Sequence, residues 1–210
     1  MGMSINLHLI SACSIVAPIL IGAFYFKSLP FALRILFIYV AITGPLELVA
    51  SVMSAYEMNN LFLFNAHIYI EFFAILAIFF FSYDSVFWRG VVGVFLVSFL
   101  GFSVLSRLFF DAWDPFNANE RYAEGLMVIV LCAGYYISLL RRLIHRYLEQ
   151  QPMFWLASGW LIYFAGTLYL FLFSKELLEL DSFQFFQIHA ILNIGLNVIY
   201  VISFVKGRRL

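Results

Sequence analysis

The chain has 210 residues, of which 64% are hydrophobic, 20% aromatic and only 11% charged, and its mean hydropathy is +0.97. Soluble domains carry about 25% charged residues, so this composition leaves too little polar surface to cover a soluble core. The 12 lysines and arginines balance the 12 aspartates and glutamates, which excludes the basic surplus that electrostatic nucleic-acid binding requires. We therefore expect a polytopic membrane protein, a single transmembrane domain over residues 1–210.

Seven apolar segments are each long enough to cross a bilayer as a helix, which takes about 20 residues. They lie at about 6–26, 33–55, 61–82, 88–108, 122–141, 153–174 and 184–205. The segments are too long and too continuously apolar for the alternating strands of a membrane barrel. The sequence therefore predicts an all-α bundle of seven transmembrane helices.

The positive charges predict the orientation, because lysine and arginine concentrate on the cytoplasmic side of a membrane. Nine of them lie at one set of helix ends, namely Lys27, Arg34, Arg89, Arg141, Arg142, Arg146, Lys206, Arg208 and Arg209. Three lie at the other ends, namely Arg107, Arg121 and Lys175. We expect the N-terminus outside, the C-terminus in the cytoplasm, and a bacterial plasma membrane as the location.

Part of the basic side is also a candidate contact surface for a partner protein or for anionic lipid. It consists of the inner end of the fifth helix and the C-terminal tail, with Arg141, Arg142, Arg146, Arg208 and Arg209. The excess of positive charge on the cytoplasmic side would by itself account for these residues. A contact surface and a simple orientation signal therefore both stay open.

An internal repeat relates the second and third helices to the sixth and seventh at an offset of 122 residues, which carries His67 onto His189. Gly44, Leu46, Leu48, Glu57 and Phe64 also meet the identical residue at this offset. The pattern predicts a parallel three-plus-one-plus-three arrangement. Its first repeat covers about 6–82, its linker helix about 88–108 and its second repeat about 122–205.

This layout resembles that of the seven-helix sugar carriers and vitamin carriers. The Pro-Gln signature of the sugar carriers is absent from the first helix, so the resemblance is one of architecture and implies no site residues. Segments 64–71, 154–166 and 189–200 are similar to an uncharacterised group of bacterial seven-helix integral membrane proteins. That resemblance implies the same fold and supplies no activity.

Several polar side chains fall within the predicted spans, where such groups are costly and usually functional. At 1.5 Å per residue, His67, Glu71, His189, Asn193 and Glu47 lie about 8–15 Å below the outer boundary. His67 and Glu71 share one helix face, and His189 and Asn193 repeat that spacing. With Tyr163 of the sixth helix, they form the predicted ligand-binding set. Glu124 and His8 are further ionisable groups near span ends.

Three interpretations compete for this polar layer. The groups are either hydrogen-bonded structural contacts, or a pocket in the outer half of the membrane for a small polar solute or an ion, or a transition-metal site formed by His67, Glu71 and His189. The repeat and the shared depth favour a carrier. The alternatives are a sensor that signals through a separate partner and a metal-dependent hydrolase. No cofactor is identified, and an enzyme is the less favoured class.

Overall fold

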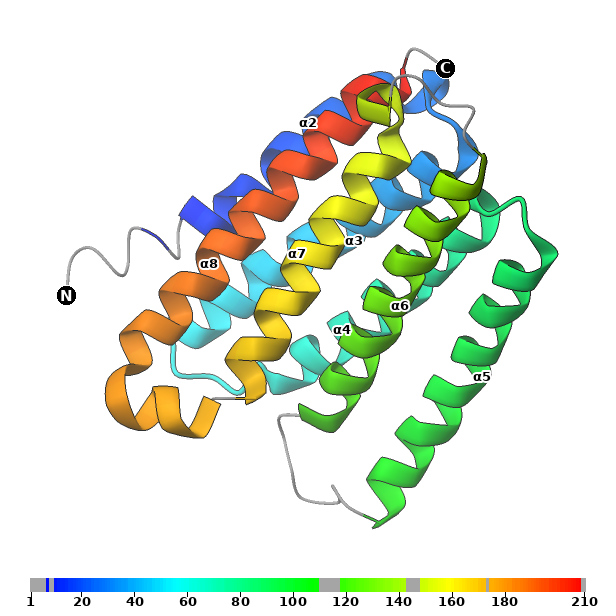
Figure 1. The fold of residues 1–210 in the computed structure, drawn as a ribbon. Helices are drawn as coiled ribbons and strands as arrows, with labels where there is room; N and C mark the ends of the chain where they lie inside the picture. Colours follow the sequence, from blue (N-terminus) through cyan, green and yellow to red (C-terminus); the bar gives the residue numbers. More distant parts are fainter. Residues whose placement is uncertain (1–6, 8–9, 110–117, 143–147, 173, 209–210) are drawn as a thin grey trace.

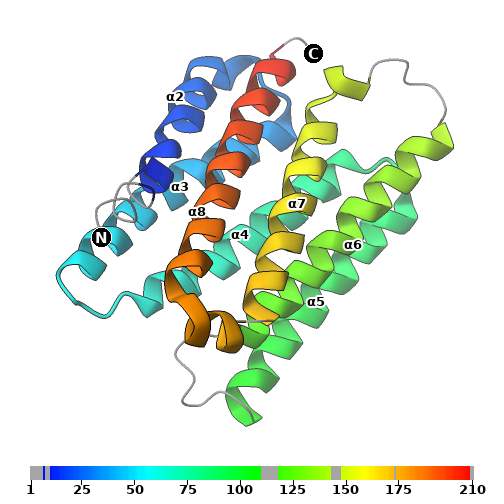
Figure 2. The same cartoon turned by 60° about the vertical axis from the view of Figure 1, so that its left-hand side comes forward.

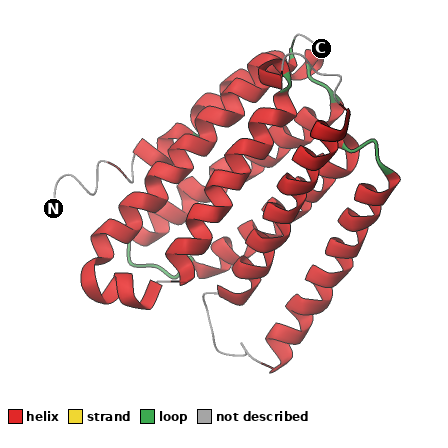
Figure 3. Ribbon diagram, viewed as in Figure 1, coloured by secondary structure: helices red, strands yellow, loops and turns green. Residues whose placement is uncertain are grey.

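The computed structural model describes residues 7, 10–109, 118–142, 148–172 and 174–208. In this part of the chain every regular element is helical (Figure 3). The long helices are α2 (Val16–Tyr25), α3 (Phe31–Ala55), α4 (Leu61–Ser82), α5 (Val86–Phe109), α6 (Ala118–Arg142), α7 (Pro152–Leu172) and α8 (Ser174–Gly207). Residues 10–14 extend α2 toward the N-terminus, and short 3-10 turns follow α2 (Phe26–Ser28) and precede α7 (Leu148–Gln150).

Seven helices in the described residues are long and apolar enough to cross a membrane, which confirms the predicted number of spans. The spans are Ile10–Ser28, Phe31–Met53, Leu61–Ser82, Val86–Leu108, Asn119–Arg141, Pro152–Leu170 and Gln187–Gly207. The largest difference is at α8, which begins at Ser174, whereas the seventh span was predicted from about 184. Its charged first turns fail a hydropathy criterion, but they contain no proline or glycine that would end a helix. The chain is a polytopic, all-α membrane protein.

The helices run up and down the bundle, with most chain neighbours packed side by side (Figures 1 and 2). Helix α8 also packs against α2, and α6 also packs against α4. Helix α5 lies at the edge of the bundle against α4 and α6, and it exposes an apolar face that includes Val94, Val97 and Leu108. The seven-helix count rests on the length and hydropathy of the described helices, whereas the internal repeat and the orientation stay predictions.

We distinguish the two ends of the bundle by their residues. The basic end is the end at which α3 begins, and it carries Lys27, Arg34, Arg89, Arg141, Lys206 and Arg208. The Asn60 end is the opposite end, at which α4 begins. The predicted contact residue Arg141 is exposed at the basic end. Arg208, exposed as well, donates a hydrogen bond to the Tyr25 hydroxyl. Arg146, Arg209 and the side chain of Arg142 lie outside the described residues.

Aliphatic and aromatic side chains together pack the centre of the bundle. The fully buried aromatic side chains include Phe72, Phe79, Phe99, Trp160, Phe164 and Phe204. Helices α7 and α8 approach closely at two glycines. A Cβ atom at Gly159 would lie 2.7 Å from Cγ2 of Ile199, and one at Gly166 would lie 2.7 Å from Cδ1 of Leu192.

Candidate functional site

Glu71 is the centre of the polar site. Helix α4 places its side chain on the inward face, where it is 1% exposed. Its Oε1 atom accepts a hydrogen bond from the Tyr39 hydroxyl of α3 at 3.1 Å, and its Oε2 atom accepts one from Nη1 of Arg121 of α6 at 2.5 Å. One turn away, Nε2 of His67 lies 3.7 Å from the same Oε2 atom. Three helices therefore hold one buried carboxylate.

Arg121 and Glu124 complete what we call the charged cluster, which is Glu71, Arg121 and Glu124. Nη1 of Arg121 also donates to Oε2 of Glu124 at 2.8 Å, so one guanidinium nitrogen serves two carboxylates. The Arg121 side chain is 15% exposed and that of Glu124 is fully buried. Within the described part of the chain, Oε1 of Glu124 has no hydrogen-bond partner. The cluster therefore lies inside the bundle and has one free acceptor atom.

Tyrosine hydroxyls surround the charged cluster on the side of α7 and α8. Tyr39 meets the ring of Tyr200 edge-on, with ring centroids 6.4 Å apart. The Tyr200 hydroxyl accepts a hydrogen bond from Nε1 of Trp160 at 3.1 Å. Tyr163 of α7 lies within electrostatic range of Glu71 and Arg121. Because Tyr39, Tyr163 and Tyr200 are all buried, this polar layer faces the bundle interior and is shielded from lipid.

The charges of the cluster do not balance. Two carboxylates share one guanidinium, which leaves one negative charge in surroundings where an uncompensated ion is costly. His67 contributes a positive charge only when it is protonated. The cluster therefore has the chemistry to accept a proton or a cation.

The predicted ligand-binding residues divide into three groups in the structure. His67 and Glu71 are in contact, and Glu47 and Tyr163 lie within electrostatic range of Glu71 and Arg121. The ring of His189 meets that of Tyr163 edge-on, with centroids 6.3 Å apart.

Asn193 makes a different kind of contact. Its Nδ2 atom donates to Oγ of Ser11 at 3.1 Å, and one turn later Nδ2 of Asn197 donates to Oγ of Ser14 at 2.7 Å. Both bonds join α8 to the N-terminal helix, and such interhelical hydrogen bonds contribute to packing in membranes.

Arg121, Tyr39 and Tyr200 are site residues that the sequence analysis missed, and Arg121 is the most important of them. It was counted among the three positive charges of the outer boundary, but its side chain turns inward to Glu71. The available signal was its spacing from Glu124, since residues three apart on a helix share a face and can form an ion pair. With Arg121 inside the bundle, the predicted count of positive charges at this set of helix ends falls from three to two.

A second polar group, which we call the Glu120 cluster, lies between α4, α5 and α6 and consists of Glu120, Ser103, Tyr69 and Arg107. Oε1 of Glu120 accepts hydrogen bonds from Oγ of Ser103 at 2.6 Å and from the Tyr69 hydroxyl at 2.8 Å. Nε of Arg107 lies 3.6 Å from the same oxygen. Glu120 is 1% exposed and Arg107 is 56% exposed, so this cluster links the interior to the outside of the bundle.

The two histidines that the predicted repeat relates have similar but not equivalent surroundings. The His67 ring meets Tyr39 of the preceding helix edge-on at 6.2 Å, as the His189 ring meets Tyr163. The repeat offset carries Tyr39 onto Leu161, however, so the two tyrosines do not correspond. The repeat stays a prediction.

The described residues contain no group of three or more histidine, cysteine, aspartate or glutamate side chains placed to hold a metal ion. His67 and Glu71 are neighbours, but His189 does not form such a group with them. The metal-dependent hydrolase therefore has no ligand set in this part of the chain. His8 lies outside the described residues.

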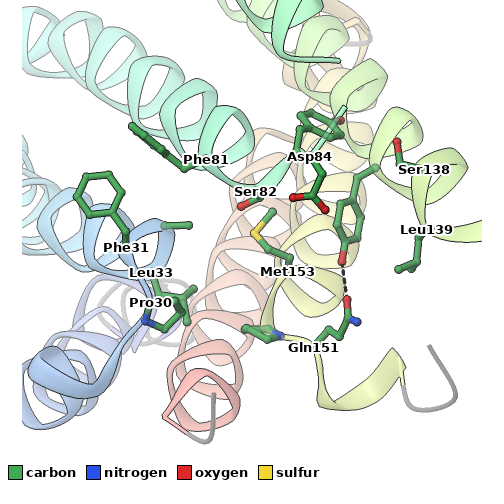
Figure 4. Close-up of a pocket in the computed structure, with 14 residues that line it drawn as sticks. Pro30, Phe31, Leu33, Phe81, Ser82, Asp84, Ser138, Leu139, Gln151 and Met153 are labelled. Carbon is green, nitrogen blue, oxygen red and sulfur yellow. Dashed lines mark hydrogen bonds between the residues drawn. The ribbon is translucent and has the colours of Figure 1, made fainter. Parts of the chain in front are cut away.

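A cavity of about 440 Å³ opens at the basic end, between the start of α3, the end of α4, the end of α6 and the start of α7 (Figure 4). Its lining includes apolar groups such as Phe31, Leu33 and Met153. The polar lining residues are Ser82, Asp84, Tyr135, Ser138 and Gln151, and the Tyr135 hydroxyl donates to Oε1 of Gln151 at 3.3 Å.

Comparison of the chain with models of protein families, with curated proteins and with solved structures gave no match. The fold and the buried polar residues therefore define a class, that of polytopic membrane proteins with seven spans, and the function is inferred from the site itself.

Proposed function

We propose that the protein is a membrane carrier that binds a small polar solute or an ion at the charged cluster. The observation that carries this proposal is the ionic contact of Arg121 with two fully buried carboxylates, Glu71 and Glu124. Charged groups inside a membrane protein are costly and usually mark a ligand or ion pathway. Neutral hydrogen bonds, such as those of Asn193 and Asn197, hold helices together without that cost.

The cavity at the basic end supports the same proposal. A carrier needs an opening on each side of its site, with a barrier between the site and the closed side. Along α4, Tyr83 at the cavity lies about 18 Å from Glu71, at 1.5 Å per residue. The cavity and the charged cluster thus lie in opposite halves of the bundle.

Aromatic side chains form the barrier between the cavity and the charged cluster. The ring of Tyr83 stacks on Phe79 with centroids 5.6 Å apart, and Phe79 meets Trp160 at 5.5 Å. Trp160 then donates to Tyr200, which meets Tyr39. This continuous series of contacts ends at Glu71. In a carrier, movement of these rings would open the path from the cluster to the cavity.

The test combines binding with uptake. The purified protein is screened by thermal shift against amino acids, amines, carboxylates, sugars and alkali cations, and each stabilising compound is tested for uptake into liposomes. We expect saturable uptake of at least one compound. Glu71→Gln should abolish it, whereas Glu149→Gln, an exposed carboxylate at the basic end, should preserve it.

Two results would decide against the carrier. Binding without uptake would favour a sensor that uses the same site and signals through a partner. If no class of compound binds and Glu71→Gln only lowers the melting temperature, the cluster is a structural contact.

A further inference from the structure

Two buried carboxylates on α6 each have one oxygen atom without a hydrogen-bond partner in the described part of the chain, namely Oε2 of Glu120 and Oε1 of Glu124. The side chains are 1% and 0% exposed. A buried acceptor without a partner costs about 1–3 kcal/mol, and more when it is charged. The two residues are four apart, so they are neighbours on the helix, about 6 Å apart along its axis.

We propose that Glu120 and Glu124 form a proton relay on α6, which brings a proton from the Asn60 end to the charged cluster and couples transport to proton movement. The coupling to transport rests on the proposed carrier function, whereas the relay itself does not. In this proposal the ion that the site accepts is a proton. Oε2 of Glu120 and Oε1 of Glu124 then have the same role, which is to bind that proton in turn.

Glu120 is suited to be the entry group of the relay. Its Oε1 atom accepts hydrogen bonds from Ser103 and Tyr69 and lies 3.6 Å from Nε of Arg107, so Oε2 is the oxygen atom that remains for the relay. Arg107 is 56% exposed, so this cluster reaches the boundary of the bundle. A proton from water can therefore bind Glu120 without first crossing the apolar interior.

Glu124 is suited to be the inner group. Arg121 carries one positive charge, and its contact with Glu71 at 2.5 Å neutralises it. A second ionised carboxylate at Glu124 would leave a net negative charge in the interior, so Glu124 holds the proton on its bare Oε1 atom. The other titratable groups that face the charged cluster are His67 of α4, Tyr39 and Glu47 of α3, Tyr163 of α7 and Tyr200 of α8.

The transfer step is balanced. The O–H bond at Oε2 of Glu120 breaks and a new O–H bond forms at Oε1 of Glu124, one helical turn away, with water as the carrier of the proton between them. Glu120 is left as a carboxylate, stabilised by its hydrogen-bond donors. Release of the proton from Glu124 toward Glu71 or the bound solute leaves both carboxylates ionised, and uptake of a new proton from water by Glu120 then restores the state from which the transfer began.

The relay is tested by infrared difference spectroscopy of the purified protein in lipid bilayers without any solute. We expect the C=O stretching band of a buried carboxylic acid, which shifts in heavy water. Glu124→Gln should remove this band, whereas Glu149→Gln should leave it unchanged. Glu120→Gln should keep the band but slow its hydrogen–deuterium exchange roughly 100-fold, the contribution of one positioned proton-transfer group.

The proposal is overturned if the wild type has no such band, if the band survives Glu124→Gln, or if Glu120→Gln exchanges at the wild-type rate. Loss of the band on addition of sodium at constant pH would also overturn it, because the site would then hold a metal cation. If Glu124→Gln does not fold, Glu124→Asp must shift the band, and an unshifted band excludes Glu124 as its source. If the uptake assay fails but the spectra are as expected, the carrier function is rejected and the proton relay still stands.

Discussion

Replacement of Arg121 by methionine tests whether the charged cluster is the interior ion pair that the structure shows. The substitution removes two charge-assisted hydrogen bonds, at 2.5 Å to Glu71 and 2.8 Å to Glu124. Such bonds contribute about 1.5–3 kcal/mol each, and breaking a buried ion pair costs about 3–5 kcal/mol because the remaining charge is unpaired. We therefore expect the free energy of unfolding to fall by about 4 kcal/mol.

The measurement is the thermal melt of the detergent-solubilised protein. For a chain of this size 1 kcal/mol lowers the melting temperature by about 2–4 °C, so Arg121→Met should lower it by about 8–16 °C. The matched control is Arg141→Met, since that arginine is exposed at the basic end and an exposed charge contributes about 0–1 kcal/mol.

A triple variant separates charge from shape. Glu71→Gln, Arg121→Met and Glu124→Gln together leave no unpaired charge, and neutral replacement of a buried ionic group is often close to neutral in stability. The triple variant should therefore melt well above Arg121→Met and show no uptake. If Arg121→Met melts like the wild type, or if the triple variant melts as low as the single variant, the assignment of a buried ion pair is wrong.

Three further predictions concern packing, the polar layer and orientation. Gly159→Val should lower the free energy of unfolding by about 1–3 kcal/mol, because the added side chain would overlap with Ile199. Gly93→Val should lower it far less, since no atom lies within 4 Å of the added Cβ. Equal melting temperatures of the two variants would contradict the close α7–α8 contact. Asn193→Ala removes the hydrogen bond to Ser11, so it should lower the free energy of unfolding by about 1 kcal/mol and retain uptake. Loss of uptake at unchanged stability would instead identify Asn193 as a ligand-binding residue. A cytoplasm-active reporter fused after Leu210 should be active and a periplasm-active one inactive, and the opposite result would reverse the orientation.

The fold class and the number of spans could be predicted from the amino-acid sequence alone. In a bilayer each crossing segment must satisfy its own backbone hydrogen bonds, so about 20 apolar residues become a helix whatever surrounds them. This rule is local, and it holds for all seven segments. The hydropathy pattern misplaced the start of α8, whose first turns are charged. Hydropathy indicates which residues cross the hydrocarbon, whereas a helix can continue beyond it. The placement of His67 and Glu71 on one face of one helix followed from their spacing of four residues.

Only the tertiary structure decided which polar groups meet. Arg121 and Glu71 are 50 residues apart, and Asn193 and Ser11 are 182 apart. Residues at the same depth, such as Glu71 and Asn193, have different partners because the rotation of each helix and its choice of neighbours decide where a side chain points. Those two quantities depend on long-range packing, including the close contact that Gly159 and Gly166 permit, and no local pattern encodes them. Arg121 looked like a boundary charge for the same reason: a long arginine side chain at a helix end reaches either water or an interior carboxylate, and the neighbouring helix α4 decides which.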